Sequence, residues 1–289
     1  MPYKLIINEP YDVYLSFYPS FIYPLFEIRK KDSICILKKT IGMYKCSTIS
    51  IKDNTVYFTG VNNSIVQEWL GLWFKPWLLL NEVDRKYLGF IENLVEKFSS
   101  IRIAISGEDK PWVFLSVFLS RNTSFHTNTV KWIRKIGSIE PINPFNIDPA
   151  NVGGSYQLKQ LAEILKTRSI VDKLVTLISR ISTEKDAWKA RANLLKIKYV
   201  GPKTVDAFLL FTTRYSFFTP SDRHYKSFIQ SFLDRKLNLP LKKYCLRYTC
   251  FSCPYNGSCL TGWSISSFGR LSGWIQTLSY LYGNNKIAI

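Results

Sequence analysis

The sequence predicts an α+β fold, in which a small antiparallel sheet precedes a mostly helical, two-lobed body with a cysteine loop near its end. Two observations carry this prediction. Up to about residue 80, short apolar stretches alternate with turn residues, which is typical of short strands. From about residue 81, apolar residues recur at helical spacing, and loops rich in Gly, Pro and Asn separate the helical segments.

The individual elements follow from local patterns. Asp53 and Asn54 form a hairpin turn between two apolar runs, and Tyr87, Ile91 and Leu94 belong to one apolar helical stripe. The predicted strands are residues 34–37, 48–51 and 55–59. The predicted helices after the first are residues 112–120, 127–135, 156–165, 170–181 and 184–194. The predicted domains are a sheet domain (1–80), a linking helix (81–111), a helical domain (112–213) and a second helical lobe (214–289) that carries the cysteine loop (245–259).

The composition indicates a folded protein with a polyanionic partner. The chain has 289 residues, with 39 Lys and Arg against 21 Asp and Glu, so its formal net charge is +18. A hydrophobic content of 46% excludes a disordered basic tail. Such an excess in a folded chain favours nucleic acid or an anionic membrane face, and the plain alternative is a solubilising surface.

The membrane alternative has little support in the sequence. Apolar runs such as residues 112–119 are far shorter than the roughly 18 residues that a membrane span needs, and the N-terminal residues do not form a signal peptide. We therefore expect a cytoplasmic, DNA-associated monomer that does not bind membranes.

Charge is unevenly distributed along the chain. From Arg235 to the end there is no acidic residue. We expect this stretch to form a positive face around the cysteines. Its basic residues are Arg235, Lys236, Lys242, Lys243, Arg247, Arg270 and Lys286.

A tight turn at Gly201 joins two helical patterns. Gly201 permits the positive φ or close approach that such a turn requires. Backbone N–H groups at the start of the following helix can receive a DNA phosphate without reading its sequence. An ordinary connection between two helices would show the same pattern.

Two residues near this turn have the chemistry of a covalent catalyst. Lys203 lies in the first turn of a helix, where the helix dipole and the nearby Lys198 favour a free amine that can act as a nucleophile. Asp222 precedes another helical pattern and is a natural N-cap, which by itself would explain its presence.

These motifs resemble those of the helix–hairpin–helix, Gly/Pro-Asp superfamily of DNA glycosylases. The residues that carry the resemblance are Val200-Gly201-Pro202-Lys203-Thr204 and Pro220-Ser221-Asp222-Arg223-His224. Upstream, residues 110–123 are similar to the family's helix and wedge loop. Downstream, residues 273–280 resemble the C-terminal helix of 8-oxoguanine DNA glycosylases, and the N-terminal part resembles the extra domain of those enzymes and of the 3-methyladenine glycosylases.

The resemblance implies a role for each matching residue. Lys203 would attack C1′ of a flipped nucleotide and Asp222 would stabilise the developing positive charge. Asn122, with Arg121 beside it, would fill the space that the flipped nucleotide leaves in the duplex. His224 would contact a phosphate, and so would the turn at Gly201. Gln276 and Tyr280, four residues apart on one helix face, would hold the base, although helix packing would explain the same spacing.

Four cysteines near the C-terminus have the pattern of a metal site. Cys245, Cys250, Cys253 and Cys259 are separated by four, two and five residues. Four thiolates in one short loop suit a [4Fe–4S] cluster, and zinc is the alternative. The spacing resembles that of endonuclease III-type enzymes, whose first gap is two residues longer. We expect the cluster to shape a loop whose Lys242, Lys243 and Arg247 contact phosphates.

The sequence therefore favours a bifunctional glycosylase and AP lyase that acts on damaged double-stranded DNA, with 8-oxoguanine as the first candidate base. An oxidised-pyrimidine or alkyl-purine glycosylase is the alternative within the same superfamily. A non-catalytic DNA-binding protein is the alternative from another class, and it would need neither Lys203 nor Asp222. A zinc-containing transcription factor would need a base-reading helix rich in Arg, Asn and Gln, which the sequence does not show.

Overall fold

A five-stranded antiparallel sheet forms the N-terminal part of the computed structural model, which describes residues 3–289. Its strand order is β1-β5-β4-β3-β2. The strands are β1 (Tyr3–Ile6), β2 (Phe26–Lys31), β3 (Ile34–Lys39), β4 (Thr48–Lys52) and β5 (Thr55–Thr59). The predicted strands and hairpin turn are confirmed in β3–β5. The prediction missed β1, which is only four residues long and mostly exposed, and β2, which ends in the exposed basic run Arg29–Lys31.

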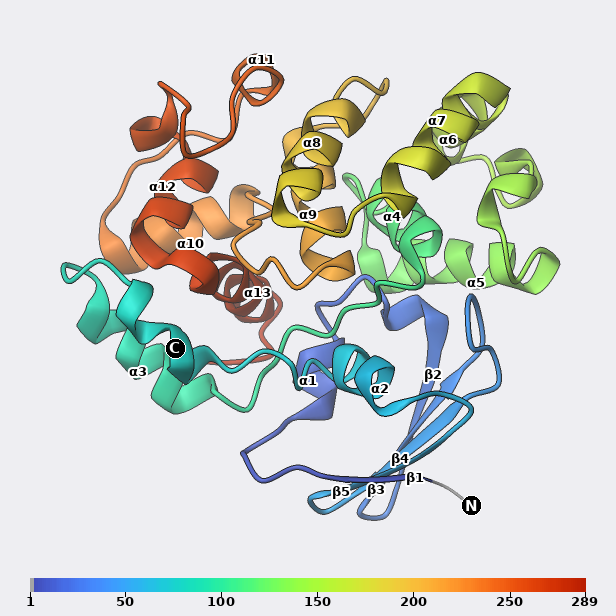
Figure 1. Ribbon diagram of the computed structural model, residues 1–289, viewed down its shortest axis with the longest axis horizontal. Coiled ribbons are helices and arrows are strands. Elements are labelled where there is room, and N and C mark those ends of the chain that lie inside the picture. Colours follow the sequence, from blue (N-terminus) through green and yellow to red (C-terminus); the bar gives the residue numbers. More distant parts are fainter. Residues whose placement is uncertain (1–2) are drawn as a thin grey trace.

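Thirteen α-helices are found among residues 3–289, which confirms the predicted α+β fold class. The first two, α1 and α2, lie between the sheet and the helical body (Figure 1). The helices are α1 (Val13–Phe17), α2 (Asn63–Trp69), α3 (Leu88–Phe98), α4 (Lys110–Leu119), α5 (Val130–Ile139), α6 (Tyr156–Leu165), α7 (Arg168–Ser179), α8 (Glu184–Leu194), α9 (Pro202–Thr212), α10 (Arg223–Leu233), α11 (Lys242–Cys245), α12 (Leu260–Phe268) and α13 (Ser272–Gly283). No helix within residues 3–289 is both long and apolar enough to cross a membrane.

The local signals for these helices agree with the structure. The helices predicted between residues 112 and 194 are present with their ends shifted by a few residues at most, except that residues 127–129 belong to a π-helical turn (Phe125–Thr129) that leads into α5. A π-turn inserts an extra residue into each hydrogen-bonded ring, and apolar spacing does not reveal it. The predicted linking helix (81–111) is much shorter in the structure, where α3 covers only Leu88–Phe98.

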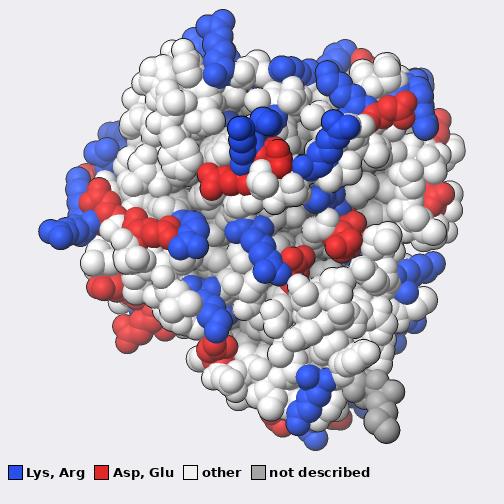
Figure 2. Space-filling view, viewed as in Figure 1, with Lys and Arg blue, Asp and Glu red and all other residues white. Residues whose placement is uncertain are grey.

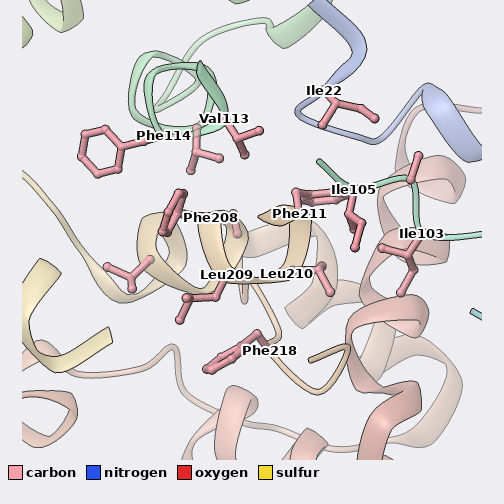
Figure 3. Packing of buried hydrophobic residues seen from close by; sticks show 14 of the residues in the cluster. Ile22, Ile103, Ile105, Val113, Phe114, Phe208, Leu209, Leu210, Phe211 and Phe218 are labelled. Carbon is pink, nitrogen blue, oxygen red and sulfur yellow. The ribbon is translucent and has the colours of Figure 1, made fainter. Parts of the chain in front are cut away.

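Helix α9 runs through the middle of the hydrophobic core. All nine residues from Thr204 to Thr212 are buried, and a helix that is buried on every side lies inside a protein rather than on its surface. Figure 3 shows its segment 208–211 between Val113 and Phe114 of α4, Ile22 of the N-terminal part, and Ile103 and Ile105 of the segment before α4. Because α9 is enclosed in this way, the residues at its N-terminal end have fixed positions.

A buried ion pair fastens the sheet to the helical body. Lys39, at the end of β3, lies with its Nζ 2.9 Å from Oδ2 of Asp109, the N-cap residue of α4, and both side chains are fully buried. Asp109 also accepts hydrogen bonds from the Met43 amide (2.8 Å) and the Ser106 hydroxyl (2.7 Å). Gly42 has a φ of +83°, and a Cβ there would lie 2.1 Å from the Asp109 carboxylate. The carboxylate is therefore fully satisfied inside the interface.

The variant Lys39→Met is expected to lower the free energy of unfolding by about 3–5 kcal/mol, because it leaves Asp109 as an uncompensated buried charge. Urea denaturation measures this change. Asp172→Asn is the matched control, since it removes the exposed ion pair with Arg168 and should cost less than about 1 kcal/mol. Equal effects of the two substitutions would contradict the importance of the buried pair.

Candidate active site

Lys203 and Asp222, which are 19 residues apart in the sequence, are in contact in the structure. Lys203 is the second residue of α9, and its Nζ lies 3.0 Å from Oδ2 of Asp222. The other carboxylate oxygen of Asp222 accepts a hydrogen bond from the Tyr225 amide at 2.9 Å, as expected for the N-cap residue of α10. Lys198, by contrast, points away and pairs with Glu163 at 2.6 Å. The residue facing the Lys203 amine is therefore a carboxylate and not a second lysine.

The two partners of this ion pair differ in exposure. The side chain of Asp222 is 13% exposed, whereas that of Lys203 is 50% exposed. The carboxylate is fixed by its two contacts, while the amine stands at the opening of a cavity. Such an arrangement presents a solvent-accessible amine beside an anchored carboxylate.

A pocket behind this ion pair, here called the inner pocket, is lined by the four residues predicted for catalysis and base binding. Lys203, Asp222, Gln276 and Tyr280 all contribute to its wall, together with aromatic residues that include Phe125. Gln276 and Tyr280 come from the same face of α13, as their spacing predicted. Burial raises the pKa of the Tyr280 phenol, which is therefore neutral at pH 7. Aromatic walls with a neutral phenol and an amide suit a planar heteroaromatic ligand.

The N-terminal part of the chain closes the inner pocket, which sequence reasoning did not find. Pro19 and Phe21, from the segment between α1 and β2, line the pocket together with the helical residues. Phe21 packs edge-on against Phe125 and Phe211, at ring-centroid distances of 5.0 and 5.4 Å. No motif in the sequence marks this segment, because its role depends on where the sheet docks.

A larger groove of about 870 Å³ opens onto the inner pocket. It contains Asn122, Gly201 and His224 of the predicted DNA-contact residues, and it shares Lys203 and Asp222 with the pocket. Asn122 is exposed and has a left-handed backbone with a φ of +49°. A Cβ on Gly201 would meet nothing within 4 Å, so the space before the N-terminus of α9 is open to a ligand.

The turn before α9 differs in detail from the prediction. Gly201 has an extended backbone with a φ of −111°, so it does not supply the positive φ. That conformation occurs two residues earlier, at Tyr199, with a φ of +65°. An aromatic residue in this conformation is uncommon, and the sequence held no signal for it.

Arg121 does not line the groove, although it was predicted as a DNA contact. Its guanidinium donates hydrogen bonds to the carbonyls of Phe118 and Tyr199, both at 2.7 Å, and to Oε1 of Gln160 at 2.8 Å. It also lies 3.8 Å from the centroid of the Phe118 ring. These contacts are all internal to the protein.

His126, which follows Asn122 in the same loop, faces the groove from the π-helical turn. Its ring stacks on that of Tyr18 with centroids 3.9 Å apart. Burial, together with the charge of Lys286, lowers the pKa of His126 to about 4. The imidazole is therefore neutral at pH 7 and joins the loop to the N-terminal part by aromatic packing.

The four cysteines of the loop line a second pocket together with Arg191. None of them forms a disulfide. Arg191 on α8 donates to Sγ of Cys245 at 3.7 Å and also pairs with Asp206 on α9, where its Nη2 lies 3.0 Å from Oδ2. Burial raises the pKa of the Cys245 thiol, and the Arg191 charge opposes that effect. Sequence reasoning missed Arg191, since nothing in its own segment indicates a contact 54 residues away.

The donor set of this loop fits a metal group, since four free thiols and a cation that can stabilise thiolate surround one pocket. As arranged among residues 3–289, no three Cys, His, Asp or Glu side chains converge as ligands of a single ion.

The basic residues predicted around the cysteines differ in their environments. Lys242 donates a hydrogen bond to the Val200 carbonyl at 2.8 Å and so fastens the loop to the turn before α9. Lys243 and Arg247 are exposed and do not line the groove. On the face shown in Figure 2, basic and acidic side chains are interspersed and do not form a continuous positive band.

Comparison with known proteins gives matches in structure and none in sequence. No family model and no curated protein sequence matches the chain. An 8-oxoguanine glycosylase/lyase from Clostridium acetobutylicum, solved with dsDNA containing cytosine opposite to 8-oxoG, superposes with a TM-score of 0.68 at 16% identity, over 99% of this chain and 98% of that chain. A 3-methyladenine DNA glycosylase from Archaeoglobus fulgidus superposes with a TM-score of 0.61 at 12% identity, over 99% of this chain and 100% of that chain.

Both similarities extend over nearly the whole chain, including the N-terminal sheet and the helical body. The superpositions and the position of the turn before α9 agree with the resemblance seen in the sequence. The chain therefore has the fold of the helix–hairpin–helix DNA glycosylases.

Proposed function

We propose that this chain is a bifunctional DNA glycosylase, which removes a damaged base from double-stranded DNA and then cleaves the strand at the abasic site. The observation that carries the proposal is the 3.0 Å contact between Lys203 Nζ and Asp222 Oδ2 at the opening of a pocket that also holds Gln276 and Tyr280. A protein that only binds DNA has no need of an amine and a carboxylate at the mouth of an aromatic pocket.

The reaction begins with a nucleotide flipped out of the duplex, because its glycosidic bond is inaccessible in the base stack. The groove is large enough to receive a DNA strand, and the open N-terminus of α9 at Gly201 is the natural site for a phosphate. Asn122, exposed beside the groove, occupies the space that the flipped base leaves. His224, which also lines the groove, contacts a neighbouring phosphate.

The chemical steps follow from the ion pair. The Lys203 ammonium first gives a proton to Asp222, the adjacent acceptor. Asp222 passes this proton on to the departing base, and the carboxylate that this step restores stabilises the positive charge that develops at C1′. The free amine then forms a bond to C1′ while the glycosidic bond breaks, and the base departs with that electron pair and gains a proton. The bound nitrogen then loses a proton while the ring oxygen leaves C1′ with its electron pair and gains a proton, so that the open sugar is held as a Schiff base. Loss of a proton from C2′ then expels the 3′ phosphate by β-elimination.

The base removed is, in this proposal, an oxidised one, with 8-oxoguanine first. The amide of Gln276 can bond to the edge of the base while Tyr280 packs on its face. One structural neighbour acts on 8-oxoguanine by its name and another on 3-methyladenine. An alkylated purine is therefore the alternative substrate, with an oxidised pyrimidine as the other member of the class.

We also propose that Cys245, Cys250, Cys253 and Cys259 hold a [4Fe–4S] cluster, with zinc as the alternative. The support is the four free thiols around one pocket and their spacing within 15 residues of the sequence. The group would keep the loop folded against the turn before α9, where Lys242 bonds to Val200. Exposed Lys243 and Arg247 would then contact the DNA backbone.

Borohydride is expected to trap a covalent complex between the wild-type protein and duplex DNA with an abasic site, because it reduces the Schiff base. Lys203→Gln should form no such complex but should still bind the DNA. Lys196→Gln, which changes an exposed lysine of the same region, is the matched control and should trap as the wild type does. Trapping that persists in Lys203→Gln would refute the assignment of the nucleophile.

Gln276→Ala is expected to slow release of the preferred base at least 10-fold, because a hydrogen bond to the base edge is lost. Borohydride trapping at a preformed abasic site, which has no base to hold, should stay within about 2-fold of wild type. A panel of duplexes with 8-oxoguanine, an oxidised pyrimidine or an alkylated purine, scored separately for base release and strand cleavage, identifies the substrate. An equal loss at the abasic site would mean that Gln276 does not act through the base.

Purified protein is expected to be brown, with broad absorbance near ~400 nm and about four iron atoms per chain. Cys253→Ser should lose the colour and the iron. Cys46→Ser, at an exposed cysteine outside the loop, should keep both. A colourless wild-type protein with one zinc ion per chain would replace the cluster with the alternative metal.

A further inference from the structure

Two residues with left-handed backbones line a cavity beside the groove, and both are linked to Arg121. Tyr199 in the turn before α9 has a φ of +65°, and Asn122 at the start of the loop after α4 has a φ of +49°. A left-handed conformation at a residue other than glycine costs roughly 1–3 kcal/mol and persists only where surrounding contacts enforce it. Each of these two conformations is therefore held by contacts from neighbouring residues.

Tyr199 is held at its backbone and at its side chain. Its carbonyl accepts a hydrogen bond from Nη1 of Arg121 at 2.7 Å. Its hydroxyl donates to Glu163 at 2.6 Å, and the same carboxylate pairs with Lys198 at 2.6 Å. The side chain is thus turned toward α6, and Arg121 is the residue that reaches the backbone of the turn.

The residue before Asn122 is Arg121 itself, and it is also held at both ends. Its carbonyl accepts hydrogen bonds from Nε2 of Gln157 at 2.9 Å and from the Tyr156 hydroxyl at 3.2 Å. Its guanidinium bonds to Phe118 and Gln160 as well as to Tyr199. Arg121 therefore joins the end of α4, the start of α6 and the turn before α9 through one side chain and one peptide group.

These contacts bear directly on the site. A cavity of about 250 Å³ is lined by Arg121, Asn122, Tyr199, Gly201 and Lys203 together. Asn122, which is proposed to fill the vacated space, therefore lies around the same cavity as the proposed phosphate site at Gly201 and the proposed nucleophile Lys203. The Arg121 side chain also lines this cavity. A change in the position of Arg121 would alter the spacing between all three.

We propose that Arg121 is a positioning residue that locks the turn before α9 and the Asn122 loop into one rigid unit, rather than a residue that contacts DNA. The proposal rests on the proposed function, in that the unit sets the distance between a docked phosphate and the space vacated by the flipped nucleotide. Preorganisation of this kind favours the flipped state because the protein does not have to order these segments on binding. Lysine cannot replace Arg121, because the three acceptors are bound by three different nitrogens of the planar guanidinium, whereas the donors of an ammonium group all lie on one atom.

The first test uses the free protein and does not depend on the proposed function. Amide hydrogen exchange in Arg121→Met is expected to speed up at least 10-fold in two segments at once, residues 197–201 and residues 120–124. Arg121→Lys should behave like Arg121→Met. Lys196→Met is the matched control and should leave both segments unchanged. Faster exchange in neither segment, or in the Asn122 loop alone, would overturn the proposal.

The second test separates positioning from direct contact with DNA. Each neutralised phosphate contributes about 0.9 to the slope of log K against log salt concentration. Arg121→Met should weaken binding to duplex DNA with an abasic-site analogue while the salt slope remains that of wild type. Lys243→Met, at an exposed lysine of the cysteine loop, is the reference for a phosphate contact and should reduce the slope by about 0.9. A reduction of that size in Arg121→Met would show that the guanidinium binds a phosphate and would overturn the proposal.

The third test measures whether the rigid unit held by Arg121 promotes base flipping. With a 2-aminopurine base beside the lesion, Arg121→Met should lose most of the fluorescence increase that flipping produces in the wild type. Borohydride trapping on single-stranded DNA with an abasic site, where no pair has to be opened, should stay within about 2-fold of wild type. An equal loss in both assays would assign Arg121 to catalysis or folding instead. A wild type that traps no DNA would refute the proposed function, while the exchange test would still decide the role of Arg121.

Discussion

The burial of α9 along its whole length is the constraint on which the site depends. Its nine consecutive buried residues leave the helix no freedom to shift without opening the core, since protein interiors are close-packed. The N-terminal end of α9 is therefore a fixed point at the protein surface, and Lys203 and the open N–H groups after Gly201 inherit that position. Asp222 reaches the same point from α10, and α13 adds Gln276 and Tyr280. The inner pocket forms where these three helices meet the N-terminal segment 19–21.

Three basic side chains hold other parts of the protein against α9 and the turn before it. Arg121 bonds to the Tyr199 carbonyl, Lys242 bonds to the Val200 carbonyl, and Arg191 pairs with Asp206 while it donates to Cys245. Carbonyls in an irregular turn have no partners in a helix or sheet, and a cationic donor satisfies them more strongly than a neutral one does. Part of the excess positive charge of the chain is therefore structural. It stabilises the turn that we propose as a phosphate site, and the cations that remain exposed are the ones available for the proposed contact with DNA.

The sequence predicted what depends on short-range signals. The strands β3 to β5, the helices α6 and α8, and the N-cap role of Asp222 follow from alternation, periodicity and capping, which act over a few residues. The features it missed depend on packing between distant segments. Phe21 enters the pocket only because the sheet docks beside α4. Arg121 turns toward the protein interior because Gln160 on α6 accepts a hydrogen bond from it. Tyr199 adopts its left-handed backbone because its contacts with Arg121 and Glu163 enforce it. The partners of Arg121 and Tyr199 in these contacts are all 36 or more residues away in the sequence.

Asp222 illustrates how one residue can satisfy the fold and the chemistry together. One carboxylate oxygen caps α10 through the Tyr225 amide, and the other faces Lys203. The cap fixes the orientation of the carboxylate, so that its second oxygen stays aimed at the amine without any further contact. An asparagine would keep the cap, because its side-chain oxygen accepts the same bond, but it would present no negative charge to Lys203. The structural and chemical contributions of this side chain are therefore separable at a single position, and the N-cap that the sequence indicated is the reason that the carboxylate points where the proposed reaction needs it.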